Sequence, residues 1–348
     1  MEPERVTLNT VARHVGVSRS TVSNAYNHPD QLSADLREQI LAAADALGYA
    51  GPDPAARSLR RRRAGAIGLA QGTLVYSVTD PANQLLLAGI AEELEGRGLA
   101  LVLIPAREPA LQQDVLATTM LDGLIAHGDA LVDTRRKVLR DRRLPVVVLD
   151  GEPAEDERLV AIDEEAGAEA AARHLVGLGH RRLAVVSFPT WGRPPKAMCG
   201  QRAEGYQRAV AAIGGGVLPI HEAPSLGHAE LGVAIESTTR AAARVVALEL
   251  LASPDRPTGI LAMSDELAAG VLDAAHELGI AVPESLSVVG FDDAATAVSV
   301  TPQLTTVRQD LREKGRTAVR LLLDEQTARR VVLPTTLVVR GSTGPPPR

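Results

Sequence analysis

The sequence predicts a small all-α head followed by an α/β body with parallel sheets. Two patterns lead to this prediction. Apolar residues recur at helical spacing within residues 1–49, whereas after residue 63 short apolar runs alternate with longer amphipathic stretches. A chain of 348 residues is also long enough for two or three domains that each bury a hydrophobic core.

The composition is typical of a soluble globular protein, with 45% hydrophobic and 23% charged residues. No apolar run is long enough to span a bilayer, and the N-terminus lacks the basic and apolar segments of an export signal. We therefore expect a cytoplasmic protein without membrane association. The single Cys199 fits a reducing compartment and excludes a disulfide framework.

Charge is distributed unevenly along the chain, whose formal net charge is −6. Residues 1–63 hold nine Arg, no Lys and seven Asp or Glu, so this part is net positive. The remaining residues hold 28 basic and 36 acidic side chains, so the body is net negative. A basic module on an acidic body is the distribution expected when only the head binds nucleic acid.

Residues 7–27 are typical of two short helices joined by a tight turn. The first helix has an apolar face at spacing i, i+3, i+4 and i+7, formed by Leu8, Val11, Ala12 and Val15. Gly16 breaks the pattern, and Ser18 is placed to cap the second helix. In that second helix Val22 and Ala25 point inward with Val17.

The outward face of the second helix carries short or forked hydrogen-bonding side chains, namely Arg19, Ser20, Ser23, Asn24 and Asn27. Such donors and acceptors are what a recognition helix needs to reach base edges and phosphates in a major groove. The alternative is an ordinary solvated helix pair, because helical hairpins with polar faces are common.

A third helix is predicted after Ser33, ending at Gly48, with a buried stripe of Leu36, Ile40, Ala43, Ala44 and Leu47. Further on, Asp53 and Pro54 start a helix of about two turns, which is too short to be stable alone in water. Leu59 lies among arginines there. An apolar side chain in a basic segment is suited to insert between base steps of a minor groove. A basic linker is the alternative.

These motifs together resemble the lactose-repressor (LacI/GalR) family of bacterial transcription regulators. The resemblance rests on T-L-x-x-V-A-x-x-x-G-V-S-x-x-T-V-S from Thr7, on a third helix ending L-G-Y, and on A-A-R-S-L before Arg60. It continues through the body and covers nearly the whole chain. With the residues above, it implies a set of DNA-binding positions: Thr7, Ser18, Arg19, Ser20, Thr21, Ser23, Asn24, Asn27, Ala56 and Leu59.

Buried apolar strands alternating with helices predict parallel sheets covered on both faces. The expected strands are 66–70, 100–104, 123–126, 145–149, 183–187, 259–263 and 286–291, with helices such as 83–97, 166–178 and 265–278 between them. The resemblance implies a periplasmic-binding-protein-like body of two subdomains joined by three crossovers, which we expect near Ile162, Asp292 and Thr327.

The expected organisation is therefore a head at 1–49, a hinge helix or linker at 50–63, a body N-subdomain at 64–161 plus 293–327, a body C-subdomain at 162–292 plus 328–341, and a disordered tail at 342–348. A C-terminal leucine heptad repeat, which makes the lactose repressor a tetramer, is missing. We therefore expect a homodimer, which also suits two half-sites of a palindromic operator.

Polar residues follow several expected strands, and ligands of open α/β sheets bind at such carboxyl ends. By resemblance, the effector-pocket positions are His127, Asp150, Arg202, Ser264, Asp292 and Gln309. Asp80, in the loop after the first strand, and the loop residue Trp191 are further candidates. Carboxylates and a guanidinium suit the hydroxyls of a sugar or a similar polar metabolite.

Each pocket candidate has a structural alternative. Asp150 and Asp292 also fit helix or turn caps, Arg202 fits a surface helix, and Trp191 fits ordinary packing. We expect Asp265 to cap its helix without touching a ligand, and His180 to be structural. Because the chain has only two Phe, four Tyr and one Trp, a pocket walled by aromatic rings is not expected, which weakens the sugar assignment.

The function expected is an effector-responsive DNA-binding regulator, most simply a repressor. Asn24 and Tyr26 depart from the Arg and Leu usual in the family, and Asn pairs with adenine where Arg favours guanine. The alternatives are a solute-binding protein of sugar transport and a ligand-blind DNA-binding protein. The sequence has no P-loop, no G-x-G-x-x-G after a strand, no G-x-S-x-G and no metal-spaced His/Cys set, so we expect no enzyme activity, no metal and no cofactor.

Overall fold

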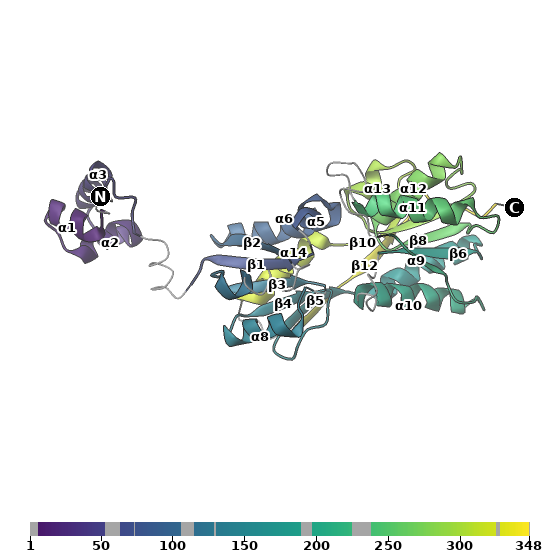
Figure 1. The fold of residues 1–348 in the computed structure, drawn as a ribbon, viewed down its shortest axis with the longest axis horizontal. Coiled ribbons are helices and arrows are strands. Elements are labelled where there is room, and N and C mark those ends of the chain that lie inside the picture. The colour runs from purple at the N-terminus through teal and green to yellow at the C-terminus, as the bar shows by residue number, and fades with distance from the viewer. Residues whose placement is uncertain are drawn as a thin grey trace. The chain divides into compact units, whose positions relative to one another are not determined.

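The computed structural model describes residues 6–52, 63–72, 74–105, 115–128, 130–188, 197–224, 238–324 and 328–347. Three predicted site residues, Ala56, Leu59 and Trp191, lie outside these ranges, as does the predicted hinge helix. The chain divides into two compact units, Met1–Gly65 and Ala66–Arg348 (Figure 1). No helix in the described ranges is long and apolar enough to cross a membrane.

The first unit is a helical head. Its elements are α1 (Leu8–Val15), α2 (Arg19–Asn27), the 3₁₀ helix η1 (Pro29–Gln31) and α3 (Ala34–Ala46). Gly16 ends α1 in the left-handed region at φ 77°, which glycine adopts without steric cost, and its N–H bonds the Ala12 carbonyl. Ser18 and Ser33 cap α2 and α3 through their hydroxyl oxygens, which confirms both predicted caps.

The head encloses one small core, whose buried members are Val11, Ala12, Val22, Ala25, Ile40 and Ala44. Tyr26 packs edge-on against Tyr49, with ring centroids 6.1 Å apart. This contact gives a physical use for an aromatic residue at position 26.

Within its described residues, the body contains two six-stranded sheets. The first sheet has the order β11-β5-β4-β3-β1-β2 and is parallel throughout. Its strands are β1 (Ala66–Gln71), β2 (Ala100–Pro105), β3 (Gly123–His127), β4 (Val146–Leu149), β5 (Arg158–Ile162) and β11 (Arg330–Leu333).

The second sheet has the order β12-β10-β9-β8-β6-β7, and only β12 pairs antiparallel, with β10. Its strands are β6 (Leu183–Ser187), β7 (Ile220–Glu222), β8 (Gly259–Ala262), β9 (Ser287–Asp292), β10 (Thr305–Gln309) and β12 (Thr335–Val338). The predicted parallel sheets are thus confirmed, with β12 as the exception.

Helices cover both faces of each sheet (Figure 1). The body's helices include α5 (Leu74–Thr79), α6 (Pro81–Glu95), α8 (Asp133–Asp141), α9 (Glu164–Leu178), α10 (Ala197–Ala211), α11 (Thr238–Ala252), α12 (Asp265–Glu277), α13 (Ala295–Ser299) and α14 (Leu311–Leu323). In the first sheet, Val147 and Leu149 face the core under α6 and α14, whereas Val146 and Val148 face the core under α8. This alternation is the strand period of two.

Helices α6 and α14 cross so closely that only glycine fits at the crossing. A Cβ on Gly89 would overlap the backbone of Arg312, and a Cβ on Gly315 would overlap the backbone of Leu86. The close crossing fixes α14 against the first sheet, and so fixes the position of Lys314, the residue before Gly315.

The chain crosses between the two sheets later than the sequence predicted at two of three points. The first crossing follows β5 at Ile162, as expected. Strand β10 pairs with β9 and stays in the second sheet, so the second crossing lies at Asp310 and not near Asp292. Strand β11 pairs with β5, so the third lies at Pro334 and not near Thr327. The subdomain limits at 293–327 and 328–341 were wrong because backbone pairing of β10 and β11 was not visible in the sequence.

The predicted disordered tail was also wrong for residues 342–347. Ser342 is fully buried, and its hydroxyl donates to the Val288 carbonyl at 2.6 Å and accepts from the Thr305 N–H at 2.8 Å. The Gly344 carbonyl accepts from His180 Nε2 at 2.9 Å. Backbone and hydroxyl hydrogen bonds therefore hold this short polar segment against the second sheet.

Candidate functional sites

The N-terminus of α2 presents a cluster of hydroxyl groups. The Ser18 oxygen accepts from the Thr21 N–H at 3.1 Å and lies 2.7 Å from the hydroxyls of Ser20 and Thr21. Ser18, Arg19 and Ser20 are all exposed. Hydroxyls, N–H groups and the positive end of a helix together suit a phosphate oxygen.

Farther along α2, two asparagines behave differently. Asn24 donates from Nδ2 to Gln31 Oε1 at 3.1 Å, at the exposed surface. Asn27 instead turns back on its own helix, donating to the Ser23 carbonyl at 2.9 Å and to the Ser23 hydroxyl at 3.3 Å. Of the predicted outward face, Asn24 therefore keeps hydrogen-bonding capacity toward solvent, whereas the amide nitrogen of Asn27 bonds within α2. Thr7 caps α1 in a mutual pairing with Thr10.

In the body, the carboxyl ends of both sheets meet through one buried lysine. Lys314 Nζ donates to Asp150 Oδ2 at 2.7 Å and to Gln309 Oε1 at 2.6 Å. Gln309 Nε2 in turn donates to Asp292 Oδ1 at 2.6 Å. Asp150 follows β4 of the first sheet, whereas Gln309 and Asp292 end β10 and β9 of the second. The chain Asp150–Lys314–Gln309–Asp292 therefore links the two subdomains, and we call it the cleft network.

Asp150 is the most strongly stabilised anion of the cleft network. Burial would raise its pKa, but Lys314 and then His127, whose Nε2 lies 3.5 Å from Oδ2, together hold the pKa of Asp150 below its usual range. Its second oxygen, Oδ1, is buried and has no hydrogen-bond partner among the described residues. The same holds for Gln71 Oε1 at the end of β1, although Gln71 Nε2 donates to Asn83. Buried acceptors without donors are uncommon in native proteins and call for a ligand or water.

Asp292 and Asp80 have the opposite electrostatics. Burial raises the pKa of Asp292 to about 7, opposed by Arg202 and reinforced by the negative charge of Asp80. Burial likewise raises the pKa of Asp80 to about 6, opposed by the Asn83 N–H and reinforced by Glu266. Asp80 also caps α6 by accepting from the Asn83 N–H at 2.9 Å, so its side chain has a structural use at the same time.

Arg202 is buried in a site that satisfies its charge internally. Its Nε donates to Glu164 Oε2 at 2.6 Å, and Nη1 donates to the Met263 carbonyl. The guanidinium lies 3.6 Å from the centroid of the Phe291 ring. Burial would lower the pKa of Arg202, but Glu164 keeps it above its ordinary value. The predicted surface alternative for Arg202 is thus excluded, and the side chain stays charged.

The cap of α12 is Ser264, not Asp265 as the sequence predicted. The Ser264 hydroxyl accepts from the Leu267 N–H at 3.1 Å. The carboxylate of Asp265 points elsewhere, accepting from the Thr306 hydroxyl at 2.6 Å and from the Ala294 N–H at 2.8 Å. The reason is local geometry: Ser264 has the extended backbone of an N-cap residue, and Asp265 already belongs to the helix.

Backbone strain is concentrated at the carboxyl ends of the strands that carry the cleft network. Four non-glycine residues in the described ranges have positive φ, and three of them, Asp150, Asp292 and Asp293, directly follow or end strands at the cleft. Asp292 has φ 119°, a region that costs a non-glycine residue about 1–3 kcal/mol. Strain of this kind persists where surrounding structure holds it, and it is frequent at ligand sites.

A hollow of about 290 Å³ opens beside the cleft network. It is lined from the first subdomain by Asp150 and Arg330 and from the second by Glu164 and Gln201. Of the cleft network only Asp150 lines this hollow, and Gln71 does not line it. The hollow therefore offers space to a small polar molecule beside one residue with an unsatisfied acceptor, Asp150.

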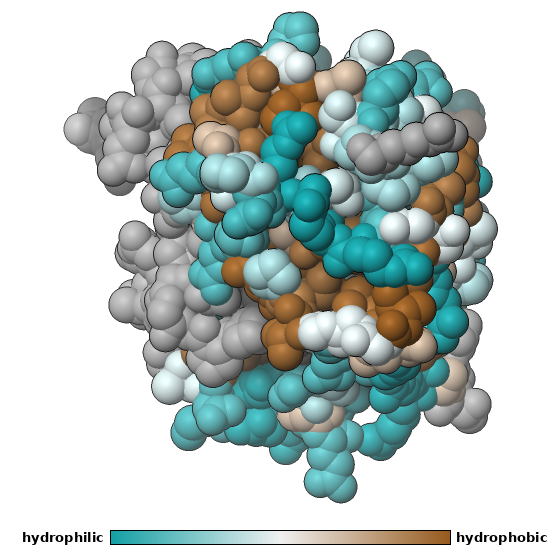
Figure 2. All heavy atoms as spheres, turned by 90° about the vertical axis from the view of Figure 1, so that its right-hand side faces the viewer, coloured by the Kyte–Doolittle hydropathy of each residue, from teal (hydrophilic) through white to brown (hydrophobic). Residues whose placement is uncertain are grey.

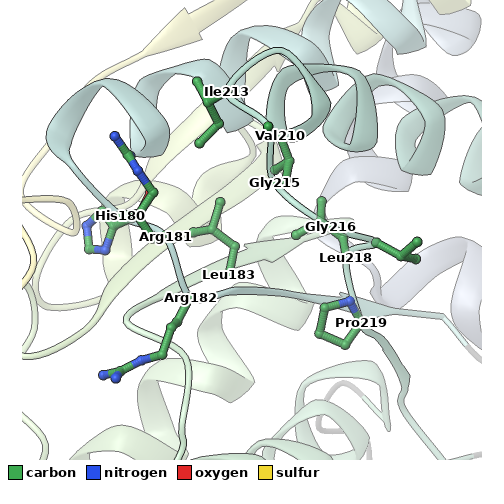
Figure 3. Close-up of a pocket in the computed structure, with 12 residues that line it drawn as sticks. His180, Arg181, Arg182, Leu183, Val210, Ile213, Gly215, Gly216, Leu218 and Pro219 are labelled. Carbon is green, nitrogen blue, oxygen red and sulfur yellow. The ribbon is translucent and has the colours of Figure 1, made fainter.

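A second hollow, of about 320 Å³, lies at the opposite edge of the second sheet, between the start of β6 and the turn 213–219. Figure 3 shows that Arg181 and Arg182 point away from it, and Arg181 donates to the carbonyls of Val176 and His180. Figure 2 shows the end of the body near the C-terminus, where bands of hydrophilic residues divide the apolar areas. With no charged group directed inward, this hollow offers no recognisable ligand chemistry.

Three cleft residues were not predicted from the sequence: Gln71, Glu164 and Lys314. A signal existed for Lys314. Its neighbours Arg312, Arg316 and Arg320 make ion pairs on the exposed side of α14, whereas Lys314 falls on the stripe with Leu311 and Ala318 that faces inward. A lysine on the buried stripe of an amphipathic helix indicates a specific partner.

Comparison with known proteins gives the family. Residues 7–51 match the family described as bacterial regulatory proteins, lacI family, and residues 172–343 match the periplasmic binding protein-like domain. An HTH-type transcriptional regulator of Mycobacterium tuberculosis is 37% identical, over 99% of this chain and 98% of that protein. The chain belongs to the lacI family of bacterial regulatory proteins. It is accordingly a DNA-binding transcriptional regulator with an effector-binding domain, and its relatives are regulators, not enzymes.

Two solved structures of transcription regulators show the same fold. The lac repressor dimer bound to operator and the anti-inducer ONPF matches with a TM-score of 0.78 and 25% identity, covering 98% of this chain and 100% of that one. The complex of the transcriptional regulator CelR with cellobiose matches with a TM-score of 0.68 and 27% identity, covering 97% and 100%. The predicted fold class, a helix-turn-helix head before a periplasmic-binding-protein-like body, is therefore confirmed.

Proposed function

We propose that this protein is a dimeric repressor, acting in the cytoplasm, that releases or binds a palindromic operator in response to an uncharged polyhydroxyl molecule in the cleft. The observation that carries the proposal is the cleft network, because one buried lysine joins the carboxyl ends of both sheets. A ligand that competes for any member of this network changes the link between the subdomains.

The chemistry of the cleft favours a ligand rich in hydrogen-bond donors. Its two buried cations are already paired, Arg202 with Glu164 and Lys314 with Asp150. What remains are acceptors: Asp150 Oδ1, Gln71 Oε1 and the carboxylates of Asp80 and Asp292. Sugar hydroxyls donate to such oxygens, whereas a phosphate or carboxylate group would add negative charge beside them. The effector is therefore a neutral sugar or related polyol, as cellobiose is for the CelR complex.

Of the predicted effector positions, six described residues lie in contact or within electrostatic range of one another: Asp80, His127, Asp150, Arg202, Asp292 and Gln309. We propose that these, with Ser264 at the start of α12, form the effector site. Trp191 belongs to the proposal on sequence grounds alone.

Control of DNA binding requires that the effector discriminate between two arrangements of the subdomains. Hydroxyls that satisfy Asp150 Oδ1 and Gln71 Oε1 on one side, and Asp292 on the other, do so only at one separation of the two strand edges. We propose that this separation is passed to the two hinge segments of the dimer and so to the contacts of Leu59 with the minor groove. The lac repressor, which binds its operator as a dimer, provides the assembly for this proposal.

The experiment that tests the proposal is selection of randomised double-stranded DNA by the full-length protein, with sequencing of the bound pool. A palindrome with two half-sites is expected, and Leu59→Ala should weaken binding to it. Effectors are then sought by adding neutral sugars and their 6-phosphates to the purified complex. If no DNA sequence is retained at low salt, the proposal that the protein is an operator-binding repressor is wrong. If phosphorylated sugars are preferred over neutral ones, only the proposed class of effector is wrong.

A further inference from the structure

The contact between Asn24 and Gln31 places a second side-chain amide beside α2. Asn24 lies in the middle of α2, and its Nδ2 donates to Gln31 Oε1 at 3.1 Å. Gln31 is the last residue of η1, a separate element that follows α2. The Asn24 amide is therefore oriented by a residue outside its own helix.

The backbone that carries Gln31 is held firmly. Pro29 starts η1, the Gln31 N–H bonds the His28 carbonyl at 3.0 Å, and the next N–H, that of Leu32, bonds the Pro29 carbonyl at 3.3 Å. Leu32 packs against the core of the head. Gln31 is thus a fixed acceptor beside α2, whereas its side chain stays exposed to solvent.

Holding the Asn24 amide matters because its last torsion is otherwise free. The χ2 angle of asparagine has a broad, roughly two-fold distribution, so an isolated amide presents its oxygen and nitrogen almost interchangeably. With one N–H directed at Gln31, Asn24 keeps one N–H donor and one carbonyl acceptor for another partner. Adenine displays one acceptor and one donor in the major groove, whereas guanine displays two acceptors there.

We propose that Gln31 is a positioning residue for operator specificity, which fixes the Asn24 amide so that Asn24 prefers adenine at one position of each half-site. The inference rests on the proposed function, since it requires that α2 enter the major groove. Pre-organisation lowers the entropy lost when the base contact forms, so Gln31 contributes to discrimination without itself contacting a base.

Asn27 provides an internal contrast. Its Nδ2 bonds within α2 to Ser23. Its Oδ1 has no hydrogen-bond partner among the described residues but is buried, so it is not accessible to a base. Asn27 therefore has less capacity left for a base than Asn24, although both lie on the same helix.

The test compares full-length wild type with four variants, Asn24→Ala, Gln31→Ala, Gln31→Glu and Asp30→Ala, by selection from randomised DNA. Asn24→Ala identifies the half-site position where adenine preference is lost. Gln31→Ala should lower the adenine preference at that same position by roughly fivefold or more, the lower end of what a bidentate base contact contributes. Gln31→Glu keeps the accepting oxygen and should keep the preference, with uniformly weaker binding from its added charge. Asp30→Ala, in the same turn, should leave every base preference unchanged.

Two results would overturn the inference while leaving the regulator intact. One is an unchanged base preference in Gln31→Ala, and the other is Asn24→Ala altering no position of the operator. Retention of no preferred sequence by wild type would instead overturn the proposed function, and the inference with it. Thermal unfolding of each variant confirms that the head remains folded.

Discussion

The body has two buried polar networks that are built on different principles: one lies at the amino edge of the second sheet, and the cleft network joins the carboxyl edges of both sheets. At the amino edge, His180 Nδ1 lies 2.9 Å from the Thr258 hydroxyl, and Nε2 lies 3.0 Å from the Ser287 hydroxyl and 2.9 Å from the Gly344 carbonyl. Because a carbonyl only accepts, Nε2 carries the proton. Burial lowers the pKa of His180, so the network is neutral at physiological pH.

At the carboxyl edge, the cleft network is charged, carries backbone strain at Asp150 and Asp292, and leaves Asp150 Oδ1 without a partner among the described residues, as Gln71 Oε1 at the end of β1 also is. The amino edge is completed by the protein's own C-terminal segment, residues 342–344. Both networks are buried and polar. What distinguishes the candidate binding site from the purely structural network in this fold is that some of its hydrogen-bond acceptors lack a donor.

The largest effect that would sharpen this comparison is expected from Lys314→Met. Removal of the ammonium leaves Asp150 as a buried anion with only His127 near it, so unfolding should become easier by about 3–5 kcal/mol. Denaturant unfolding of the full chain measures this. The double variant Lys314→Met with Asp150→Asn should recover most of the loss, because the unpaired charge is gone. A single variant as stable as wild type would show that Asp150 does not need its cation.

A smaller loss is expected from His180→Ala at the opposite edge. Thr258, Ser287 and Gly344 each lose one partner, which costs about 1–3 kcal/mol for buried neutral groups. Affinity for DNA and effector should not change, because no member of this network lies at the cleft. His276→Ala, at an exposed position on α12, is the matched control and should stay within about 0.5 kcal/mol of wild type. Loss of effector response in His180→Ala would break the distinction between the two edges.

Asp292 and His180 should make the stability of the protein depend on pH in opposite directions. A carboxyl with a raised pKa binds its proton more tightly when folded, so Asp292 makes the protein lose stability as pH rises from about 4 to about 7. The slope is at most about 1.4 kcal/mol per pH unit. Asp292→Asn should therefore match wild type near pH 4 and exceed its stability at pH 8. His180, with a lowered pKa, acts oppositely, since its stabilisation is lost as pH falls below about 6.5. Parallel curves for wild type and Asp292→Asn would contradict the raised pKa.

Effector binding adds a further check on Asp292. Donors from a polyol stabilise the ionised carboxylate, so affinity should increase as pH rises from 5 to 8 in wild type and less so in Asp292→Asn. A pH-independent affinity would place Asp292 outside the effector site.

The sequence predicted the family, seven of the twelve described strands and three of the four residues of the cleft network, because strands with polar carboxyl ends are visible as local patterns. It missed what depends on pairing between distant segments. The two later crossings were misplaced because β10 and β11 were not among the expected strands, so the sheet that each one joins could not be predicted. Lys314 was missed because its partner Asp150 lies on another element, far away in the chain. The tail was misjudged because Ser342 is ordered by hydrogen bonds to β9 and β10, which no apolar pattern in the sequence indicates.

Ser264 has two candidate roles, effector contact and helix cap, and the smallest of the predicted effects distinguishes between them. The sequence placed it in the effector pocket, whereas its hydroxyl caps α12 in the structure. Replacing an N-cap serine by glycine lowers the free energy of unfolding by only about a few tenths of a kcal/mol, whereas replacing it by alanine lowers it by about 1 kcal/mol. If capping is the whole role, Ser264→Ala is destabilised, Ser264→Gly is not, and both bind effector like wild type. If the hydroxyl also contacts the effector, both variants lose affinity equally while their stabilities differ. Isothermal titration beside thermal unfolding therefore decides whether the carboxyl end of β8 belongs to the binding site or only supports it.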